Sequence, residues 1–361
     1  MSLTLTVDGD RWRRHLRAVA AAQPGLVPVA KGNGYGFGLG RLARKADWLG
    51  CDTLAVGTYP ELPEVASRFA GDLLVLTPWR PFGPALEVSD ALHKRVVHTV
   101  SRVEDLRDLR QRQPGARVVL ELVTSMLRHG VDAYGLRAAA AVLGASGGRH
   151  LEGVALHLPL ASGSHLAEVH RLVDEVVGAG LAPASPDNQL GRRTTLWVSH
   201  LTDEELDKLR TTHADFDIRP RIGTGLWLGD RSALRVTATV LDVHAVERGE
   251  LFGYRGRSAP KSGHIVVVSG GTAHGIGLEA PTGDSSMKAR AATLARGGLD
   301  AVGFVRSPYT IDGKQRLFAE PPHMQASMLF LPSGAHVPAV GDELDVRVRF
   351  TATTFDRVVI A

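Results

Sequence analysis

Residues 26–36 read Leu-Val-Pro-Val-Ala-Lys-Gly-Asn-Gly-Tyr-Gly, an apolar run that ends in a lysine and passes into a glycine-rich segment. An apolar run of this length is typical of a β-strand that is buried on both faces. Seven further runs follow at near-regular intervals before residue 230, with amphipathic helical patterns between them. These runs are Thr53–Gly57, Leu73–Thr77, Val96–Val100, Arg117–Val123, Leu151–Leu158, Thr194–Ser199 and Asp217–Thr224.

The alternation of eight strands with eight helices over residues 1–230 predicts an α/β domain of the (β/α)₈, or TIM-type, barrel class. The clearest helical patterns are Gly9–Ala22, Gly38–Leu49, Val103–Gln113, Val131–Leu143, His165–Val177 and Thr202–Thr212. The alternative is a doubly wound open sheet, which shows a glycine-rich turn after its first strand and usually has fewer strands.

Residues 231–361 have a different pattern, which predicts a second, mainly β domain. Short β-like runs are separated by turns rich in glycine, proline and aspartate. One helix is expected here, at Ser285–Arg296. The expected strands are Arg235–Val246, Gly263–Val268, Gly303–Arg306, Met328–Leu331 and Glu343–Phe350.

Composition narrows the class of protein. The chain has 361 residues, of which 44% are hydrophobic and 22% charged, as in ordinary two-domain globular proteins. It has no apolar stretch long enough for a membrane span and no secretory signal pattern at its start. The net charge of +4 comes from arginines spread along the chain, so nucleic-acid binding is not predicted. Cys51 is the only cysteine, which favours a reducing compartment and predicts a cytoplasmic protein.

Chemically useful side chains stand at the ends of the predicted barrel strands, where the reactive residues of such barrels gather. Lys31 ends the first strand, and His157, Ser199 and Arg221 end the sixth, seventh and eighth. Each of them alone has an ordinary structural explanation, such as a surface lysine or a helix N-cap serine. Together, a lysine amine, an arginine and a phosphate-binding loop fit pyridoxal 5′-phosphate held by the lysine as a Schiff base. No metal site is predicted.

The same segments resemble motifs of the alanine racemase family. Residues 29–36 resemble its cofactor-lysine motif, Val-Val-Lys-Ala-Asn-Ala-Tyr-Gly. Met126–Gly130 resembles its Met-x-Arg-x-Gly segment, and Arg221–Thr224 its arginine and phosphate loop on the eighth strand. In the second domain, Phe252-Gly253-Tyr254 resembles the Val-Gly-Tyr-Gly segment. The matches span nearly the whole chain in the family's order.

The resemblance implies a two-base racemase that interconverts L- and D-amino acids. Lys31 and Tyr254 are then the bases on the two faces of the reacting carbon. Arg128 and Met324 are expected to contact the substrate. The family's head-to-tail homodimer places Tyr254 and Met324 over the partner's barrel. The residues expected to bind the cofactor are Lys31, Tyr35, His157, Ser199, Arg221, Gly223 and Thr224.

Departures from the family pattern bear on the substrate. Thr272 stands where the family has a tyrosine, and the family's C-terminal tyrosine segment has no counterpart. Glu121 falls where many racemases carry a lysine, often carbamylated; it either supplies that negative charge or is an inward-facing residue without a catalytic role. We therefore expect weak alanine turnover or a preference for a larger amino acid.

Two other functions are weighed against racemisation. Decarboxylases of this architecture take a cysteine and an aspartate from the second domain, whereas Cys51 lies in the barrel. Single-domain pyridoxal-phosphate homeostasis proteins share the Arg221–Thr224 pattern. A carrier of that kind would leave Tyr254 and the β domain unexplained.

Overall fold

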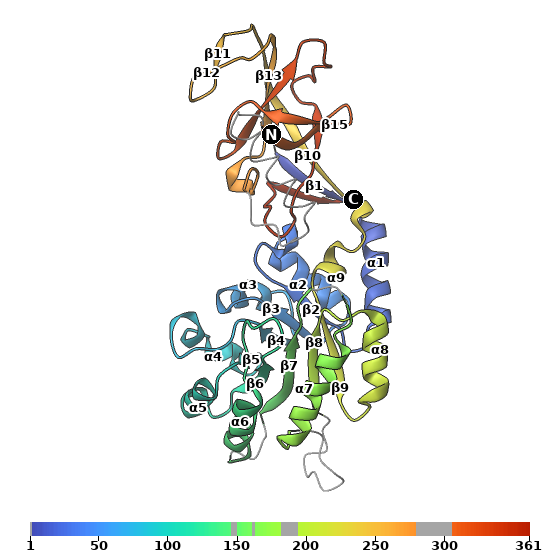
Figure 1. Cartoon of the computed structure of the whole chain (residues 1–361), viewed down its shortest axis with the longest axis vertical. Coiled ribbons are helices and arrows are strands. Elements are labelled where there is room, and N and C mark those ends of the chain that lie inside the picture. Colours follow the sequence, from blue (N-terminus) through green and yellow to red (C-terminus); the bar gives the residue numbers. More distant parts are fainter. Residues whose placement is uncertain (1, 146–149, 161–162, 182–193, 279–304) are drawn as a thin grey trace. The chain divides into compact units, whose positions relative to one another are not determined.

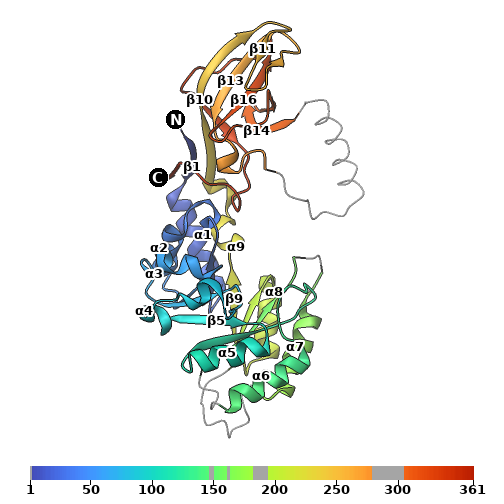
Figure 2. The same ribbon diagram turned by 90° about the vertical axis from the view of Figure 1, so that its left-hand side faces the viewer.

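A computed structural model of the chain describes residues 2–145, 150–160, 163–181, 194–278 and 305–361 (Figures 1 and 2). The chain forms two compact units. One is Arg14–Gly229, and the other joins Met1–Arg13 to Asp230–Ala361. No helix among the described residues is both long and apolar enough to cross a bilayer.

The unit Arg14–Gly229 is a closed barrel of eight parallel strands, which confirms the predicted fold class (Figure 1). Every predicted strand run coincides with one of its strands. The strands are β2 (Val27–Ala30), β3 (Thr53–Val56), β4 (Asp72–Val75), β5 (Val96–Val100), β6 (Arg117–Leu122), β7 (Leu151–His157), β8 (Thr195–Ser199) and β9 (Asp217–Ile222).

Helices connect the strands on the outside of the barrel (Figure 1). The connections after β3 and β4 hold only short helices, which explains why no long amphipathic pattern stands out there. Thr202 caps α8 as its sequence predicts, accepting a hydrogen bond from the Glu205 amide. The helices are α1 (Gly9–Ala22), α2 (Leu39–Trp48), α3 (Leu62–Ala66), α4 (Asp90–His93), α5 (Val103–Arg112), α6 (Ala133–Ala145), α7 (Leu166–Gly178), α8 (Asp203–Thr212) and α9 (Thr224–Leu228).

The middle of the barrel is filled by one apolar layer. Successive side chains of a strand point to opposite faces, so one residue of each pair faces inward. The layer makes the barrel a packed core rather than a pore. Its buried members are Val27, Val29, Ala55, Leu74, Val97, Val119, Ala155 and Trp197.

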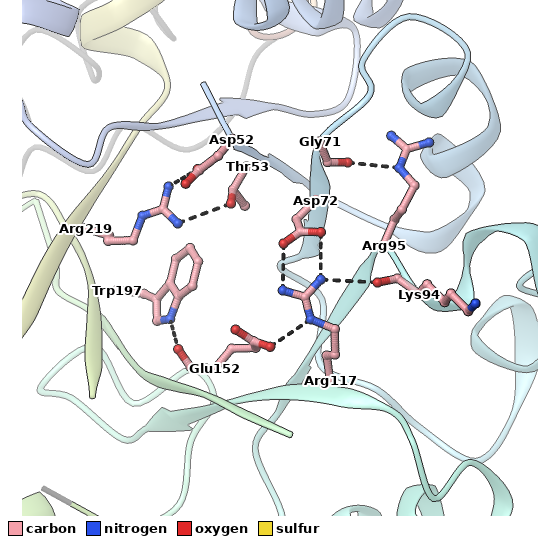
Figure 3. A network of polar contacts seen from close by, with 10 residues as sticks. All are labelled: Asp52, Thr53, Gly71, Asp72, Lys94, Arg95, Arg117, Glu152, Trp197 and Arg219. Carbon is pink, nitrogen blue, oxygen red and sulfur yellow. Dashed lines mark hydrogen bonds and ion pairs between the residues drawn. The ribbon is translucent and has the colours of Figure 1, made fainter. Parts of the chain in front are cut away.

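Two arginines close the barrel at the amino ends of its strands (Figure 3). Arg117 donates to both carboxylate oxygens of Asp72, at 2.6 and 2.7 Å, and to Glu152 at 2.8 Å. These acidic partners raise the pKa of Arg117 above its usual value. Arg219 pairs with Asp52, and its guanidinium lies 4.9 Å from the ring centre of Trp197. This polar network covers the apolar layer at the end of the barrel where the strands begin.

The other unit is mainly β, as predicted. Its sheet is mainly antiparallel, with the strands in the order β13-β16-β15-β14-β17-β10-β1-β18, and β13 also pairs with β10. Figure 2 shows β10, β13 and β16 side by side. The strands β11 (Leu251–Phe252) and β12 (Arg257–Ser258) form a separate hairpin. The sheet strands are β1 (Leu3–Val7), β10 (Leu234–Val246), β13 (Gly263–Ser269), β14 (Arg306–Ile311), β15 (Lys314–Phe318), β16 (Ala326–Pro332), β17 (Glu343–Val346) and β18 (Arg357–Ile360).

The predicted start of the barrel domain at residue 1 is wrong, because the first strand of the chain is part of the β unit. β1 pairs antiparallel with β10 and parallel with β18, so it belongs to the second unit. Leu3, Leu5 and Val7 are fully buried there, which is the physical reason for the pairing. The expected helix Ser285–Arg296 lies outside the described residues, and so does the first half of the expected strand Gly303–Arg306.

Replacing Arg117 tests the polar network at the end of the barrel where the strands begin. Arg117→Met removes three hydrogen bonds from the carboxylates of Glu152, which is 9% exposed, and Asp72, which is 34% exposed, so we expect a loss of about 2–3 kcal/mol in the free energy of unfolding. The matched control is Arg112→Met, which breaks an exposed pair with Asp108 and is expected to cost less than about 0.5 kcal/mol. Urea unfolding followed by tryptophan fluorescence measures both. Equal losses in the two variants would contradict the structural role of Arg117.

Candidate active site

A polar layer lies directly above the apolar layer of the barrel. Two residues beyond each inward-facing core position, the strand or the loop after it again presents a residue to the interior. In the first seven strands these positions are Lys31, Gly57, Leu76, Thr99, Glu121, His157 and Ser199, and in β9 Arg221 stands two residues beyond Arg219; all but Gly57 and Leu76 are polar. Four of the ten residues of the sequence-predicted site, Lys31, His157, Ser199 and Arg221, are therefore brought together by strand geometry alone.

Lys31 follows β2 at the carboxyl end of the barrel. Gly57 packs against it, since a Cβ on Gly57 would lie 2.9 Å from the Lys31 Cβ. The pKa of Lys31 is below that of an ordinary lysine, mainly because the amine is partly desolvated. The charges of Arg128 and Arg221 lower it further, and Glu61 opposes them. A lower pKa increases the fraction of neutral, nucleophilic amine at neutral pH.

Glu61 fixes the backbone around Lys31. Its carboxylate accepts hydrogen bonds from the amides of Gly32 at 2.8 Å, Gly57 at 2.7 Å and Thr58 at 3.2 Å. The carboxylate thereby joins the loop after β2 to the loop after β3. We did not predict this residue, although Thr58 and Glu61 have the spacing of a helix capping box, and that signal was available in the sequence.

Arg221 and Glu121 are a buried pair of opposite charge in the same layer. Arg221 donates to the Leu156 carbonyl at 3.1 Å, and burial lowers its pKa to about 10, so it remains protonated at neutral pH. Burial raises the pKa of Glu121, while Arg221 and Arg128 oppose that rise. Within the described part of the chain, Arg221 Nε and Glu121 Oε2 are buried without a hydrogen-bond partner. Arg221 Nε is thus available to an acceptor atom of a bound group.

His157 is held as a neutral ring. Its Nδ1 lies 2.8 Å from the Ser199 hydroxyl, and the His200 ring centre is 4.9 Å from its own. Desolvation lowers the pKa of His157 to about 3, with help from the charge of Arg221. His200 was missed by sequence reasoning, although it directly follows the predicted Ser199. Its φ of 64° is unusual for a residue other than glycine and marks a sharp turn at the end of β8.

Tyr35 and the loop after β9 form a cradle. A Cβ on Gly223 would lie 2.1 Å from the Tyr35 hydroxyl oxygen, so only glycine leaves this approach open. Tyr35 is buried, and desolvation raises its pKa to about 12, which keeps the hydroxyl protonated and able to donate. Thr224 begins α9 directly after Gly223. Tyr35, Gly223 and Thr224, three of the residues predicted to bind the cofactor, thus lie close together at the barrel rim.

Arg128 lies on the loop that follows β6. This loop is tied down through Ser125, whose amide and hydroxyl both donate to Glu168 of α7, at 2.5 and 2.8 Å. The neighbouring Leu127 has a φ of 51°, and Arg128 is exposed. The charge of Arg128 lowers the pKa of Lys31 and of His157, which places it electrostatically at the same site.

Tyr254, Thr272 and Met324 lie in the second unit. The phenol of Tyr254 is 91% exposed and Met324 is 71% exposed. The Thr272 amide donates to the His323 carbonyl at 2.8 Å, so the turn that carries Thr272 lies beside the segment that carries Met324. His274 anchors this turn through Asp356 at 3.0 Å.

Comparisons with known proteins agree with this geometry. The sequence model of the alanine racemase N-terminal domain matches residues 7–184. An alanine racemase of Nitratidesulfovibrio vulgaris is 27% identical over 277 residues, which is 72% of each chain. The chain belongs to the alanine racemase family. It is thereby an amino-acid isomerase.

Solved structures share the fold over the full length of the chain. Alanine racemase from Bartonella henselae with covalently bound pyridoxal phosphate aligns with a TM-score of 0.70 at 16% identity, covering 100% of both chains. Histidine racemase from Leuconostoc mesenteroides subsp. sake aligns with a TM-score of 0.65 at 16% identity, covering 99% of this chain and 98% of that one. Both barrel and β unit therefore have counterparts in racemases of known structure.

The residues at the barrel mouth fit pyridoxal 5′-phosphate, the cofactor that the sequence predicts. The partner-less Arg221 Nε suits a ring-nitrogen acceptor, and the Lys31 amine suits an aldehyde. The Tyr35 hydroxyl packs against Gly223 at the start of α9, and a hydroxyl donor beside the backbone of such a loop suits a phosphate group.

Gly223→Ala tests the cradle. The new methyl group would clash with the Tyr35 hydroxyl, so we expect at least a tenfold loss of pyridoxal-phosphate affinity, or about 1.4 kcal/mol. The matched control is Gly225→Ala, whose methyl group would meet only Ile222 at an ordinary 3.5 Å. Cofactor absorbance retained after gel filtration, titrated against added cofactor, measures both. Equal affinities in the two variants would place the phosphate elsewhere.

Proposed function

We propose that this chain racemises alanine or a somewhat larger α-amino acid at the mouth of the barrel, with Lys31 and Tyr254 as the two bases. The observation that carries the proposal is the polar layer, in which Lys31, His157, Ser199 and Arg221 follow the inward-facing core positions of their strands. Bound through Lys31, the cofactor supplies an electron sink that makes the Cα proton of an amino acid acidic. Tyr35, Ser199, Gly223 and Thr224 would hold its phosphate, and His157 and Arg221 its ring.

Lys31 would hold or remove the Cα proton on one face of the substrate. The partial desolvation and the two nearby arginines that lower its pKa also increase the fraction of neutral amine that can act as a base. Glu61 keeps the backbone that carries this amine fixed through three amide hydrogen bonds. Proton transfer is sensitive to such positioning.

Arg221 would keep the atom to which it donates unprotonated. A guanidinium has donors only, so a ring nitrogen that meets Arg221 Nε accepts a hydrogen bond and does not gain a second positive charge beside it. That limits how far negative charge spreads away from Cα, which favours return of the proton over side reactions. Glu121 would supply the compensating negative charge that keeps Arg221 and Arg128 together.

Arg128 would bind the substrate carboxylate, because a guanidinium pairs with a carboxylate through two parallel hydrogen bonds. Its exposure leaves it accessible to an incoming amino acid. Met324 and Thr272 would border the side-chain end of the substrate. A threonine in place of a tyrosine leaves more room there, which supports a substrate larger than alanine.

Tyr254 would provide the second base from the neighbouring subunit of a homodimer. The exposure of both Tyr254 and Met324 in their own unit supports this arrangement, since side chains that serve a partner's site must project from the surface.

A cytoplasmic location also stays part of the proposal, supported by the single cysteine, Cys51, whose thiol pKa is raised by burial to about 11.

Borohydride labelling tests the assignment of Lys31. Reduction of the cofactor-loaded protein should attach the cofactor irreversibly to one peptide, the one that contains Lys31, as peptide mass spectrometry detects. Lys31→Ala should abolish the label and the racemase activity, whereas Lys45→Ala, a change on the outer helix α2, should retain both. A label on any other lysine would contradict the inward register of β2.

A panel of single-enantiomer amino acids tests the substrate range. With Thr272 at the position of a tyrosine, we expect kcat/KM for at least one larger amino acid to equal or exceed that for alanine. Each added methylene in a fitting pocket contributes about 1–3 kcal/mol, enough to reverse a preference. Thr272→Tyr should move the preference back toward alanine. Efficient turnover of alanine with exclusion of every larger substrate would contradict the proposed wide site.

Subunit mixing tests the composite site. Lys31→Ala and Tyr254→Phe proteins should each be inactive as homodimers, while their heterodimer contains one site with both bases intact. Mixing under conditions that allow subunit exchange should therefore restore up to about a quarter of wild-type activity, because half of the dimers are mixed and each has one working site. Wild-type protein treated alike is the control. No recovery, with active controls, would show that both bases come from one chain.

A further inference from the structure

The hairpin that carries Tyr254 is a tight loop with little support of its own. β11 and β12 are two residues each, and the turn Gly253–Gly256 closes with a 3.2 Å hydrogen bond from the Gly256 amide to the Gly253 carbonyl. Two-stranded hairpins of this size are marginally stable alone. The direction of the Tyr254 side chain must therefore be set by contacts outside the hairpin.

A buried carboxylate supplies the first of those contacts. Glu320 is only 2% exposed, yet it lies beside the turn. Its Oε1 accepts the Tyr254 amide at 3.1 Å. Its Oε2 lies 2.5 Å from where a Cβ on Gly253 would stand, so glycine is required for this approach. Arg257, at the other side of the hairpin, donates to the Ala319 carbonyl at 3.1 Å. The hairpin is thus bound to the segment that ends in Glu320.

His323 supplies the second contact. Its Nε2 lies 2.7 Å from the same Glu320 oxygen and donates to that carboxylate. Its ring meets the Tyr254 ring nearly edge-on, with the ring centres 6.4 Å apart and the planes at 72°. The His323 backbone is itself fixed, because its amide donates to Ala326 at 2.9 Å and its carbonyl accepts from Thr272. Edge-to-face ring pairs of this kind have a preferred geometry.

We infer that Glu320 and His323 are positioning residues that hold the Tyr254 phenol in the direction needed for proton transfer. The inference rests on the proposed role of Tyr254 as second base. Glu320 fixes the backbone of Tyr254, and through the shared oxygen Oε1 it also orients the His323 ring that packs against the phenol ring. Without them, a tyrosine that is 91% exposed would sample several rotamers.

His323→Ala is the main test, because the His323 side chain is 45% exposed and the Glu320 carboxylate keeps its hydrogen bond from the Tyr254 amide. Comparing the rate of racemisation with the rate of Cα hydrogen exchange distinguishes a defect in Tyr254 from a defect in Lys31. In deuterated water, a two-base enzyme with an impaired Tyr254 still lets Lys31 remove the Cα proton of one enantiomer and return deuterium to the same face. We expect racemisation to fall about 10- to 100-fold in kcat with KM within twofold, since small misplacements carry penalties of this size. Exchange with retention of that enantiomer should stay within twofold.

Two further variants complete the test. Glu320→Gln keeps an acceptor oxygen but removes the charge. Its rate of racemisation should fall less than that of His323→Ala, and its rate of exchange should again stay close to that of the wild type. The matched control is His336→Ala, which removes another histidine of the same unit that pairs with a carboxylate, Asp312 at 3.4 Å. It should change neither rate.

Three outcomes would overturn the inference. Unchanged racemisation in His323→Ala shows that the ring does not position Tyr254. Equal loss of racemisation and exchange shows a general effect on folding or cofactor content. A wild-type protein that neither racemises nor exchanges any amino acid overturns the proposed function itself, and the role of the pair with it.

Discussion

The alternation of side chains along eight parallel strands of a closed barrel is the constraint from which the rest of the structure follows. Because every second residue faces inward, the positions of the apolar layer also fix which residues face the interior at the next level, two residues further along each strand. Val29, Ala155 and Trp197 belong to the apolar layer, and Lys31, His157 and Ser199 follow two residues later. The reactive groups are fixed by rigid strand ends, which hold geometry better than loops.

The same constraint explains the electrostatics of the site. Inward-facing charges at the mouth stand on an apolar floor, so they are poorly solvated and shift one another's pKa values. Desolvation lowers the pKa of Lys31, His157 and Arg221 and raises that of Glu121. At the opposite end, Arg117 and Arg219 are fully paired with carboxylates. The ion pairs at the amino ends of the strands therefore stabilise the barrel. At the carboxyl ends, Arg221 and Glu121 each keep a buried polar atom that can still form a hydrogen bond.

The barrel could be predicted from the sequence because each of its strands is a short apolar run bounded by polar turns. Lys31, His157, Ser199 and Arg221 followed from those boundaries. β1 and β18 could not be predicted in place, because a short alternating strand shows no sign of a partner more than 200 residues away. Glu61 and His200 were missed because their roles depend on hydrogen bonds and on an unusual φ, neither of which a hydrophobic pattern contains. The role of Tyr254 came from family resemblance alone.

The central claim is that the polar layer at the barrel mouth racemises an amino acid, rather than only storing a cofactor. The most direct measurement is the optical activity of a single-enantiomer amino acid, followed by chiral chromatography with the cofactor-loaded protein. The account predicts that either enantiomer of at least one amino acid converges to the same equal mixture of L and D forms. A protein that binds pyridoxal 5′-phosphate through Lys31 but leaves every amino acid optically unchanged would contradict it and would indicate a carrier.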